Sequence, residues 1–195
     1  MARAFTRKGD RFVAKLDAAE RQVVTGLLAQ TRDLVAPQGP ESTGDPFDDL
    51  VAGLGQTPDD ASGLDQPRDP ALERLVPSAN REDEEVAAEF RRLTEHGLRR
   101  RKATTLQTAI DALAAADPPK VSLDAAQAQA LAMALTDVRL VLGDRLGLHT
   151  DDDAEALHHV VTAGDADTDD PVVAIAAYYD FLTWLQESVT LALMS

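Results

Sequence analysis

The sequence has no cysteine, few aromatic residues and no long apolar run, and each absence narrows what the protein can be. Without cysteine there is no disulfide, thiolate nucleophile, cysteine-ligated zinc or cysteine redox sensor. Aromatic residues make up 4% of the chain, so the core must be built mainly from Leu, Val and Ala, which favours packed helices over β-sandwiches. Charge interrupts every apolar stretch well before the roughly 20 residues that a membrane-spanning helix needs.

The N-terminal sequence and the net charge give two further expectations. The N-terminal sequence MARAFTRKGDRF is positively charged, but no apolar region follows it as in a signal peptide. We therefore expect a cytoplasmic protein. The formal net charge is −15, and an acidic protein repels the phosphate backbone of nucleic acids at long range. Strong autonomous DNA binding therefore requires an uneven distribution of charge.

The apolar pattern predicts a mainly α fold. Residues 3–16 alternate around Lys8-Gly9-Asp10, as in a short β-hairpin. Asp17 and Glu20 have the spacing of a capping box for the helix that Pro37 ends. Helical spacing continues over residues 70–76, 82–116, 123–146, 150–163 and 171–194. We predict one single-core helical domain over residues 1–195, with five or six helices and a short N-terminal β-hairpin.

Residues 37–70 differ in composition from the rest. They are rich in Pro and Gly and carry eight carboxylates against Arg68, a composition that buries too little apolar surface to stay ordered. We predict a flexible acidic insertion. The exception is Phe47, Leu50, Val51 and Leu54, whose helical spacing predicts one or two turns docked on the core.

No pattern in the sequence indicates catalysis, a metal or a cofactor. Residues 165–170 resemble the start of a calcium loop, but Asp170 replaces the required Gly and Ala176 the required Glu. His158 and His159 are adjacent and point about 100° apart on a helix. There is no nucleophile elbow and no glycine-rich phosphate loop. We expect neither an enzyme nor a metal or cofactor protein.

The sharpest basic cluster lies in the long predicted helix, and we take it as the candidate partner-binding surface. Its members are Arg91, Arg92, Arg99, Arg100, Arg101 and Lys102. The predicted hairpin adds Arg3, Arg7, Lys8, Arg11 and Lys15, and the two could form one basic face that contacts DNA or an acidic protein. The alternative is that half of these arginines pair with carboxylates on the same helix and form a solvated face.

A second charged group lies among the leucines of the next predicted helix. Asp137, Arg139, Asp144 and Arg145 stand beside core positions, and charges beside a core are normally paired. We expect an ion-pair network that joins this helix to Arg91 or Arg92. A binding pocket is the alternative interpretation.

Six segments together resemble a known family. They are EFRRLTEHGLRRRK (89–102), DPALERLVPSA (69–79), DVRLVLGDRLGL (137–148), YYDFLTWLQESV (178–189), FTRKGDRFVAKLDAAERQVVTGLL (5–28) and DPFDDLVAGLG (45–55). As a set they look like an actinobacterial family of unknown-function proteins that includes the oxidative-stress transcriptional regulator AosR.

The resemblance implies a cytosolic regulator that acts on transcription through a sigma factor or RNA polymerase. A link to the Clp protease is a second implication, since family members are often encoded near its adaptor. The regulator is thought to sense oxidants through a cysteine pair, and this chain has none, so that sensing does not carry over. The expected function is a regulatory protein-interaction module. A homodimer through the apolar last helix, with Trp184 near the seam, is also expected.

Overall fold

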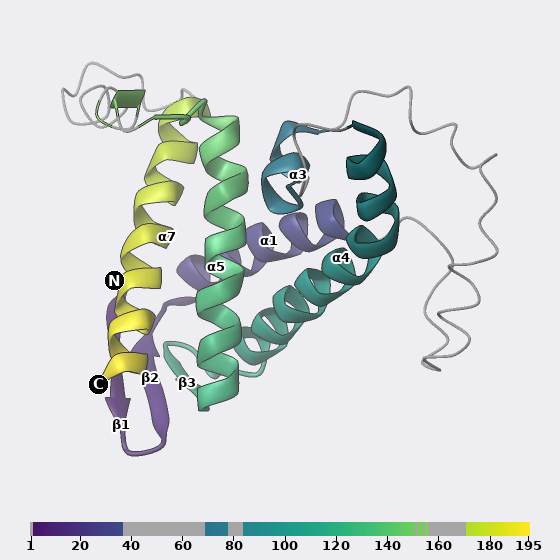
Figure 1. The fold of residues 1–195 in the computed structure, drawn as a ribbon. Coiled ribbons are helices and arrows are strands. Elements are labelled where there is room, and N and C mark those ends of the chain that lie inside the picture. Colours follow the sequence, from purple (N-terminus) through teal and green to yellow (C-terminus); the bar gives the residue numbers. More distant parts are fainter. Residues whose placement is uncertain (1, 37–68, 78–83, 151, 154, 156–170) are drawn as a thin grey trace.

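A computed structural model describes residues 2–36, 69–77, 84–150, 152–153, 155 and 171–195, with the backbone alone for residues 84–94 and 171. It confirms the mainly α fold. Five helices form the described part: α1 (Ala18–Val35), α3 (Pro70–Leu75), α4 (Glu84–Ala114), α5 (Ala125–Arg145) and α7 (Pro171–Met194). They pack around α5, which contacts each of the other four (Figure 1). Residues 37–68 of the predicted acidic insertion and most of the predicted helix over residues 150–163 lie outside the described residues.

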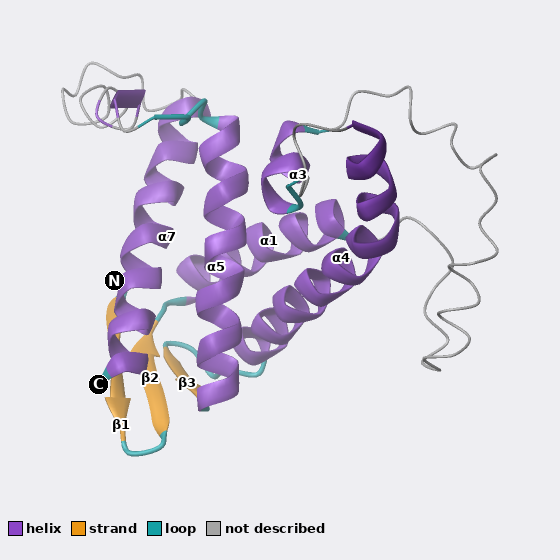
Figure 2. Ribbon diagram, viewed as in Figure 1, coloured by secondary structure: helices purple, strands orange, loops and turns teal. Residues whose placement is uncertain are grey.

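The predicted hairpin is present, and a third strand extends it into a sheet. Strands β1 (Arg3–Lys8), β2 (Arg11–Lys15) and β3 (Lys120–Leu123) form an antiparallel sheet in the order β1-β2-β3 (Figure 2). Gly9, at a φ of 64°, makes the turn between β1 and β2. In β2–β3 pairing, Phe12 lies opposite Leu123, so both add to the buried face.

Strand β3 corrects the predicted start of the following helix. We expected that helix to begin near Leu123, whereas residues 120–123 are a strand and α5 begins at Ala125. The Arg11 side chain donates to the carbonyl of Ser122 at 2.6 Å, and this bond fastens β3 beside β2. Four residues are too few to show a period of two, so only their partner strand identifies them as β.

The helix ends follow their capping residues. Asp17 and Glu20 form the predicted capping box at the start of α1, and Asp124 forms a second one with Gln127 at the start of α5. Asp69 caps α3, whose first residue is Pro70. Gly147, at a φ of 70°, follows the end of α5. Short-range sequence signals therefore set these boundaries.

One apolar cluster joins the sheet to the helices. As the scarcity of aromatics predicts, its largest fully buried side chains are leucines and valines. The two ends of the chain lie close together beside the sheet (Figure 1). There β1 packs on α7, and the Phe5 amide donates to the Ser188 hydroxyl at 3.2 Å.

Candidate interaction surface

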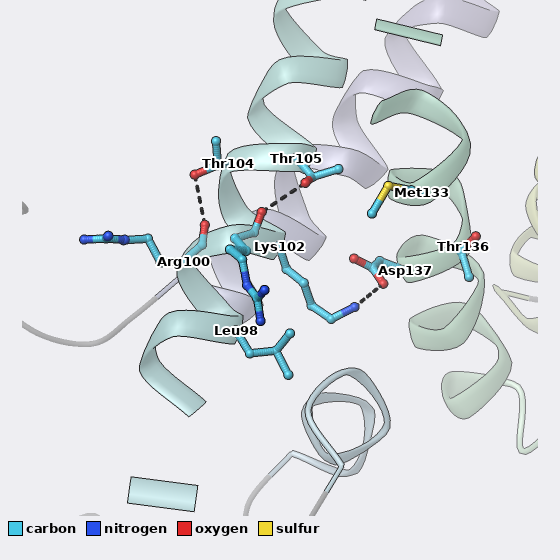
Figure 3. A pocket seen from close by; sticks show the side chains of 9 residues that line it. Leu98, Arg100, Lys102, Thr104, Thr105, Met133, Thr136 and Asp137 are labelled. Atoms are coloured by element: carbon cyan, nitrogen blue, oxygen red, sulfur yellow. Dashed lines mark hydrogen bonds and ion pairs between the residues drawn. The ribbon is translucent and has the colours of Figure 1, made fainter. Parts of the chain in front are cut away.

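Helix α4 presents one stripe of side chains to α5. Leu98, Arg101, Lys102 and Thr105 are spaced i, i+3, i+4 and i+7, so they lie on one face of the helix. Across from them on α5, Met133, Thr136 and Asp137 repeat the spacing. These residues, together with Arg100 and Thr104, line an open hollow of about 700 Å³ between the two helices (Figure 3).

The floor of the hollow holds an ion pair. Lys102 Nζ lies 2.6 Å from Asp137 Oδ1, and the two side chains are 22% and 9% exposed. Burial raises the pKa of the Asp137 carboxyl, and this effect outweighs the lowering by Lys102. The opposite charges of Lys102 and Asp137 offset one another. The net positive charge of the hollow therefore comes from Arg100 and Arg101 on its α4 rim.

The threonines of the hollow turn their hydroxyls towards helix backbones. Thr104 donates to the Arg100 carbonyl at 2.9 Å, and Thr105 donates to the Arg101 carbonyl at 3.0 Å (Figure 3). Thr136 donates to the Ala132 carbonyl and accepts a bond from the Gln186 amide. The hydroxyl groups are thus satisfied within the protein, and the methyl groups remain to line the space beside Leu98 and Met133.

Arg100 and Arg101 form the basic rim. Both are exposed, and Figure 3 shows the Arg100 side chain extending away from the Lys102–Asp137 pair. Arg100 takes part in an interaction of its own. Within the described part of the chain, the Arg101 guanidinium has no hydrogen bond or ion pair. Arg101 is therefore the cation of the hollow whose charge no described group neutralises.

Arg99, which belongs to the same predicted cluster, is used inside the fold. Its guanidinium donates to the carbonyls of Val35 and Ala36 at 3.0 Å each and reaches Leu34 at 3.5 Å. These carbonyls end α1 and have no helical partner. Arg99 also pairs with Glu95, which is 9% exposed. Arg99 therefore fastens α1 to α4.

Arg91 and Arg92 belong to α4, but their side chains lie outside the described residues. Their predicted role in partner binding, and the ion pairs that we expected them to make with α5, stay predictions. Of the six residues proposed from sequence, the structure brings Arg100, Arg101 and Lys102 together at the hollow.

Three of the four charged residues that we singled out on α5 are ion-paired in the described part of the chain, and their partners lie on α4, on α3 and at the N-cap of α3. Two pairs form what we call the α3–α5 seam: Arg74 Nε lies 3.3 Å from Asp144 Oδ1, and Arg145 pairs with Asp69. Arg139 turns the other way, donating to Gln186 at 2.6 Å and lying 5.1 Å from the centre of the Tyr179 ring. The Arg139 Nε atom is buried without a hydrogen-bond partner.

Among the described residues, the main contacts of the hairpin are with elements other than α4, so they give no support to the expected continuation of the basic surface onto the hairpin. Strand β1 packs against α7, and β2 packs against β3, α5 and α7. Two basic side chains of the hairpin make hydrogen bonds within the protein: Arg11 donates to the Ser122 carbonyl, and Arg7 donates to the Ser195 carbonyl. In the described part of the chain, the basic rim of the hollow is formed by residues of α4.

Sequence reasoning missed Met133, which is 54% exposed at the edge of the hollow. Its position three and four residues before Thr136 and Asp137 was a usable signal, because i, i+3 and i+4 share a helix face. What the sequence could not show was that this face of α5 lies opposite the arginine stripe of α4.

The described residues contain no cluster of three or more His, Asp or Glu side chains suited to a metal ion. None of the helices in this part of the chain has the length and apolar content to cross a membrane. Residues 165–170, His158 and His159 lie outside the described residues.

Comparison with known proteins identifies the family of the chain. No curated protein and no solved structure matches the chain. A family model described as a domain of unknown function, DUF2017, matches residues 2–193. The match covers the sheet and all the described helices, including both walls of the hollow. The chain therefore belongs to the DUF2017 family.

Proposed function

We propose that this protein is a regulatory protein-interaction module that binds a protein partner at the hollow between α4 and α5. The observation that carries the proposal is the difference between neighbouring basic residues of α4. Arg99 and Lys102 are bonded inside the fold, whereas Arg100 and Arg101 are exposed on the rim of the hollow. Exposed arginines beside accessible apolar side chains are typical of the residues that anchor protein interfaces.

The chemistry of the hollow favours binding over catalysis. A catalytic site needs a nucleophile or a general acid–base pair aimed at a substrate. Here the threonine hydroxyls donate to backbone carbonyls, and Asp137 faces Lys102. We therefore propose a binding surface rather than an enzyme active site.

The proposed partner is a sigma factor or RNA polymerase, in the cytoplasm. The support is the resemblance of the six segments to a family of unknown-function proteins that includes one oxidative-stress transcriptional regulator. A component of the Clp protease system is the second candidate from the same resemblance. The absence of cysteine means that any regulation proceeds without a disulfide switch.

Direct DNA binding by the basic rim is the alternative mode. A net charge of −15 opposes it, because approach to DNA is governed by long-range repulsion as well as by local contacts. Two rim arginines would also neutralise few phosphates. A gel-shift measurement at low salt distinguishes this mode from protein binding.

A homodimer through α7 is a separate proposal about assembly. On this helix Trp184, Leu191 and Met194 are 37%, 69% and 80% exposed. The Phe181 ring stacks on the Trp184 ring, with the ring centres 6.0 Å apart. Sedimentation of the native chain and of Leu191→Glu tests it: the native chain should sediment as a dimer and the variant as a monomer. A native monomer at high concentration overturns it.

The experiment for the main proposal is an affinity pull-down from native lysate. The baits are the native chain, the double variant Arg100→Glu/Arg101→Glu, and a charge-matched control, Lys8→Glu/Lys120→Glu, whose exposed lysines lie on the sheet. We expect polymerase or sigma factor with the native chain and the control, and a loss with the arginine variant. Equal recovery by all three baits would overturn the proposed surface.

A further inference from the structure

The hollow between α4 and α5 has an uneven distribution of charge that limits what can bind there. Its centre carries the Lys102–Asp137 pair, which is internally compensated. Its α4 rim carries Arg101, for which no described residue supplies a carboxylate. A ligand that matches this pattern places negative charge on one side only.

The rest of the lining is apolar. Leu98 and the 54% exposed Met133 face the space from opposite helices. The three threonines contribute methyl groups, because their hydroxyls are bonded to backbone carbonyls. A polar small molecule or a sugar–phosphate chain would find few free hydrogen-bonding groups here, whereas an aliphatic side chain would find a matching surface.

The shape of the hollow corresponds to a groove between two helices. The α4 stripe from Leu98 to Thr105 spans about 10 Å at 1.5 Å per residue, which is the length of about two helical turns. Grooves of this kind receive the apolar face of an amphipathic helix, whose anchors recur at i, i+3 and i+4.

We propose, on the basis of the proposed function above, that the partner segment is an acidic amphipathic helix of about two turns. Its apolar side chains lie between Leu98 and Met133, and a carboxylate on its edge pairs with Arg101. Arg100, which points away from the centre of the hollow, adds long-range attraction for the same negative charge. So short an interface buries little surface, so the affinity is weak, with a Kd on the order of 10 µM or more.

The chain offers a natural reporter for this site. It contains three methionines, of which Met133 lies in the hollow and Met194 lies exposed on α7. Carbon-13 labelling of methionine methyl groups in the full chain therefore gives few NMR signals, one inside the site and one outside it. A peptide that binds as proposed moves the Met133 signal and leaves the Met194 signal in place.

The probe is a synthetic helical peptide with leucines along one face and glutamates on the flanking positions. Two matched peptides are its controls: one carries lysine at each glutamate position, and the other carries serine at each leucine position. We expect the glutamate–leucine peptide to shift Met133, and each control peptide to bind at least tenfold more weakly. Arg101→Glu should weaken binding of the first peptide about tenfold, whereas Lys120→Glu should leave it unchanged.

Three results would overturn the proposal. They are no shift of Met133 with any peptide, equal binding of the glutamate and lysine peptides, and a shift of Met133 caused by duplex DNA instead of by peptide. The pull-down stays informative in each case, because it reports partner binding by the whole surface. If the arginine variant loses the partner in the pull-down but no peptide shifts the Met133 signal, the proposed function is retained and the acidic helix is rejected.

Discussion

The α3–α5 seam and the hollow between α4 and α5 use the same kinds of side chain in different ways. At the seam, Arg74 pairs with Asp144 and Arg145 pairs with Asp69. At the hollow, Lys102 pairs with Asp137, but Arg101 has no partner among the described residues. The role of an arginine in this protein therefore follows from what lies across from it. The seam joins elements of one chain, and we propose that the hollow offers its charge to a second molecule.

The largest expected effect is a difference in stability between variants of two arginines of α4, Arg99 and Arg101. Arg99→Ala removes the bonds to the carbonyls that end α1 and leaves buried Glu95 without this cation. We expect it to lower the free energy of unfolding by about 2 kcal/mol. Arg101→Ala makes the same chemical change at an exposed position and should cost less than about 0.5 kcal/mol.

Urea unfolding of the two variants measures this difference. Arg99→Lys is a useful third variant, because it keeps the charge but lacks the planar fork that reaches several carbonyls at once. Equal losses from Arg99→Ala and Arg101→Ala would show that the arginine cluster acts as a unit, against the division proposed here.

The next effect in size concerns the seam. A double-mutant cycle with Arg74→Ala and Asp144→Ala should give a coupling energy of about 1 kcal/mol, because the pair is partly buried, at 29% and 9% exposure. The cycle with Arg145→Ala and Asp69→Ala should give less than about 0.5 kcal/mol, since Arg145 is 44% exposed. A reversed order would show that exposure is not what separates the two pairs.

A smaller effect is expected in the acid response of the seam. The hydrogen bond from Arg145, helped by the Ala71 amide, lowers the pKa of the Asp69 carboxyl. The ionised Asp69 carboxyl therefore contributes stability at pH values above its ordinary pKa of 3.8. This contribution is lost as the pH falls through the lower pKa that the carboxyl has in the folded protein. Asp69→Asn keeps a good helix cap and removes the charge. This variant should lose stability near neutral pH and lose less at low pH, as urea midpoints against pH would show.

The smallest effect belongs to the floor of the hollow. Burial raises the pKa of the Asp137 carboxyl in the folded protein. Ionising this carboxyl therefore costs stability, and the cost grows as the pH rises from 3.8 through the raised pKa. Asp137→Asn removes this cost together with the attraction to Lys102. We expect a change within about 0.5 kcal/mol near neutral pH, and a flatter dependence on pH. A loss above about 1 kcal/mol would mean that the ion pair outweighs its burial.

The part of the fold that sequence reasoning found depends on local signals. The turn at Gly9, the capping box at Asp17 and the start of α3 at Pro70 all follow from residues a few positions apart. Strand β3 was missed because it becomes a strand only when β2 lies beside it. The pairs that α5 makes with Arg74 and Asp69 were not foreseen for the same reason, since these two residues lie far away in the chain.

By itself the sequence determined that this is a helical protein with a leucine-rich core and a basic cluster on its long helix. Spacing and capping act within one or two turns, so they can be read without knowing the fold. The packing of the helices places the Arg99 side chain on the end of α1 and places Arg101 and Met133 in the lining of one hollow. Which face of α4 meets which neighbour depends on how the helices pack, and the free energy of that packing is shared across the whole core.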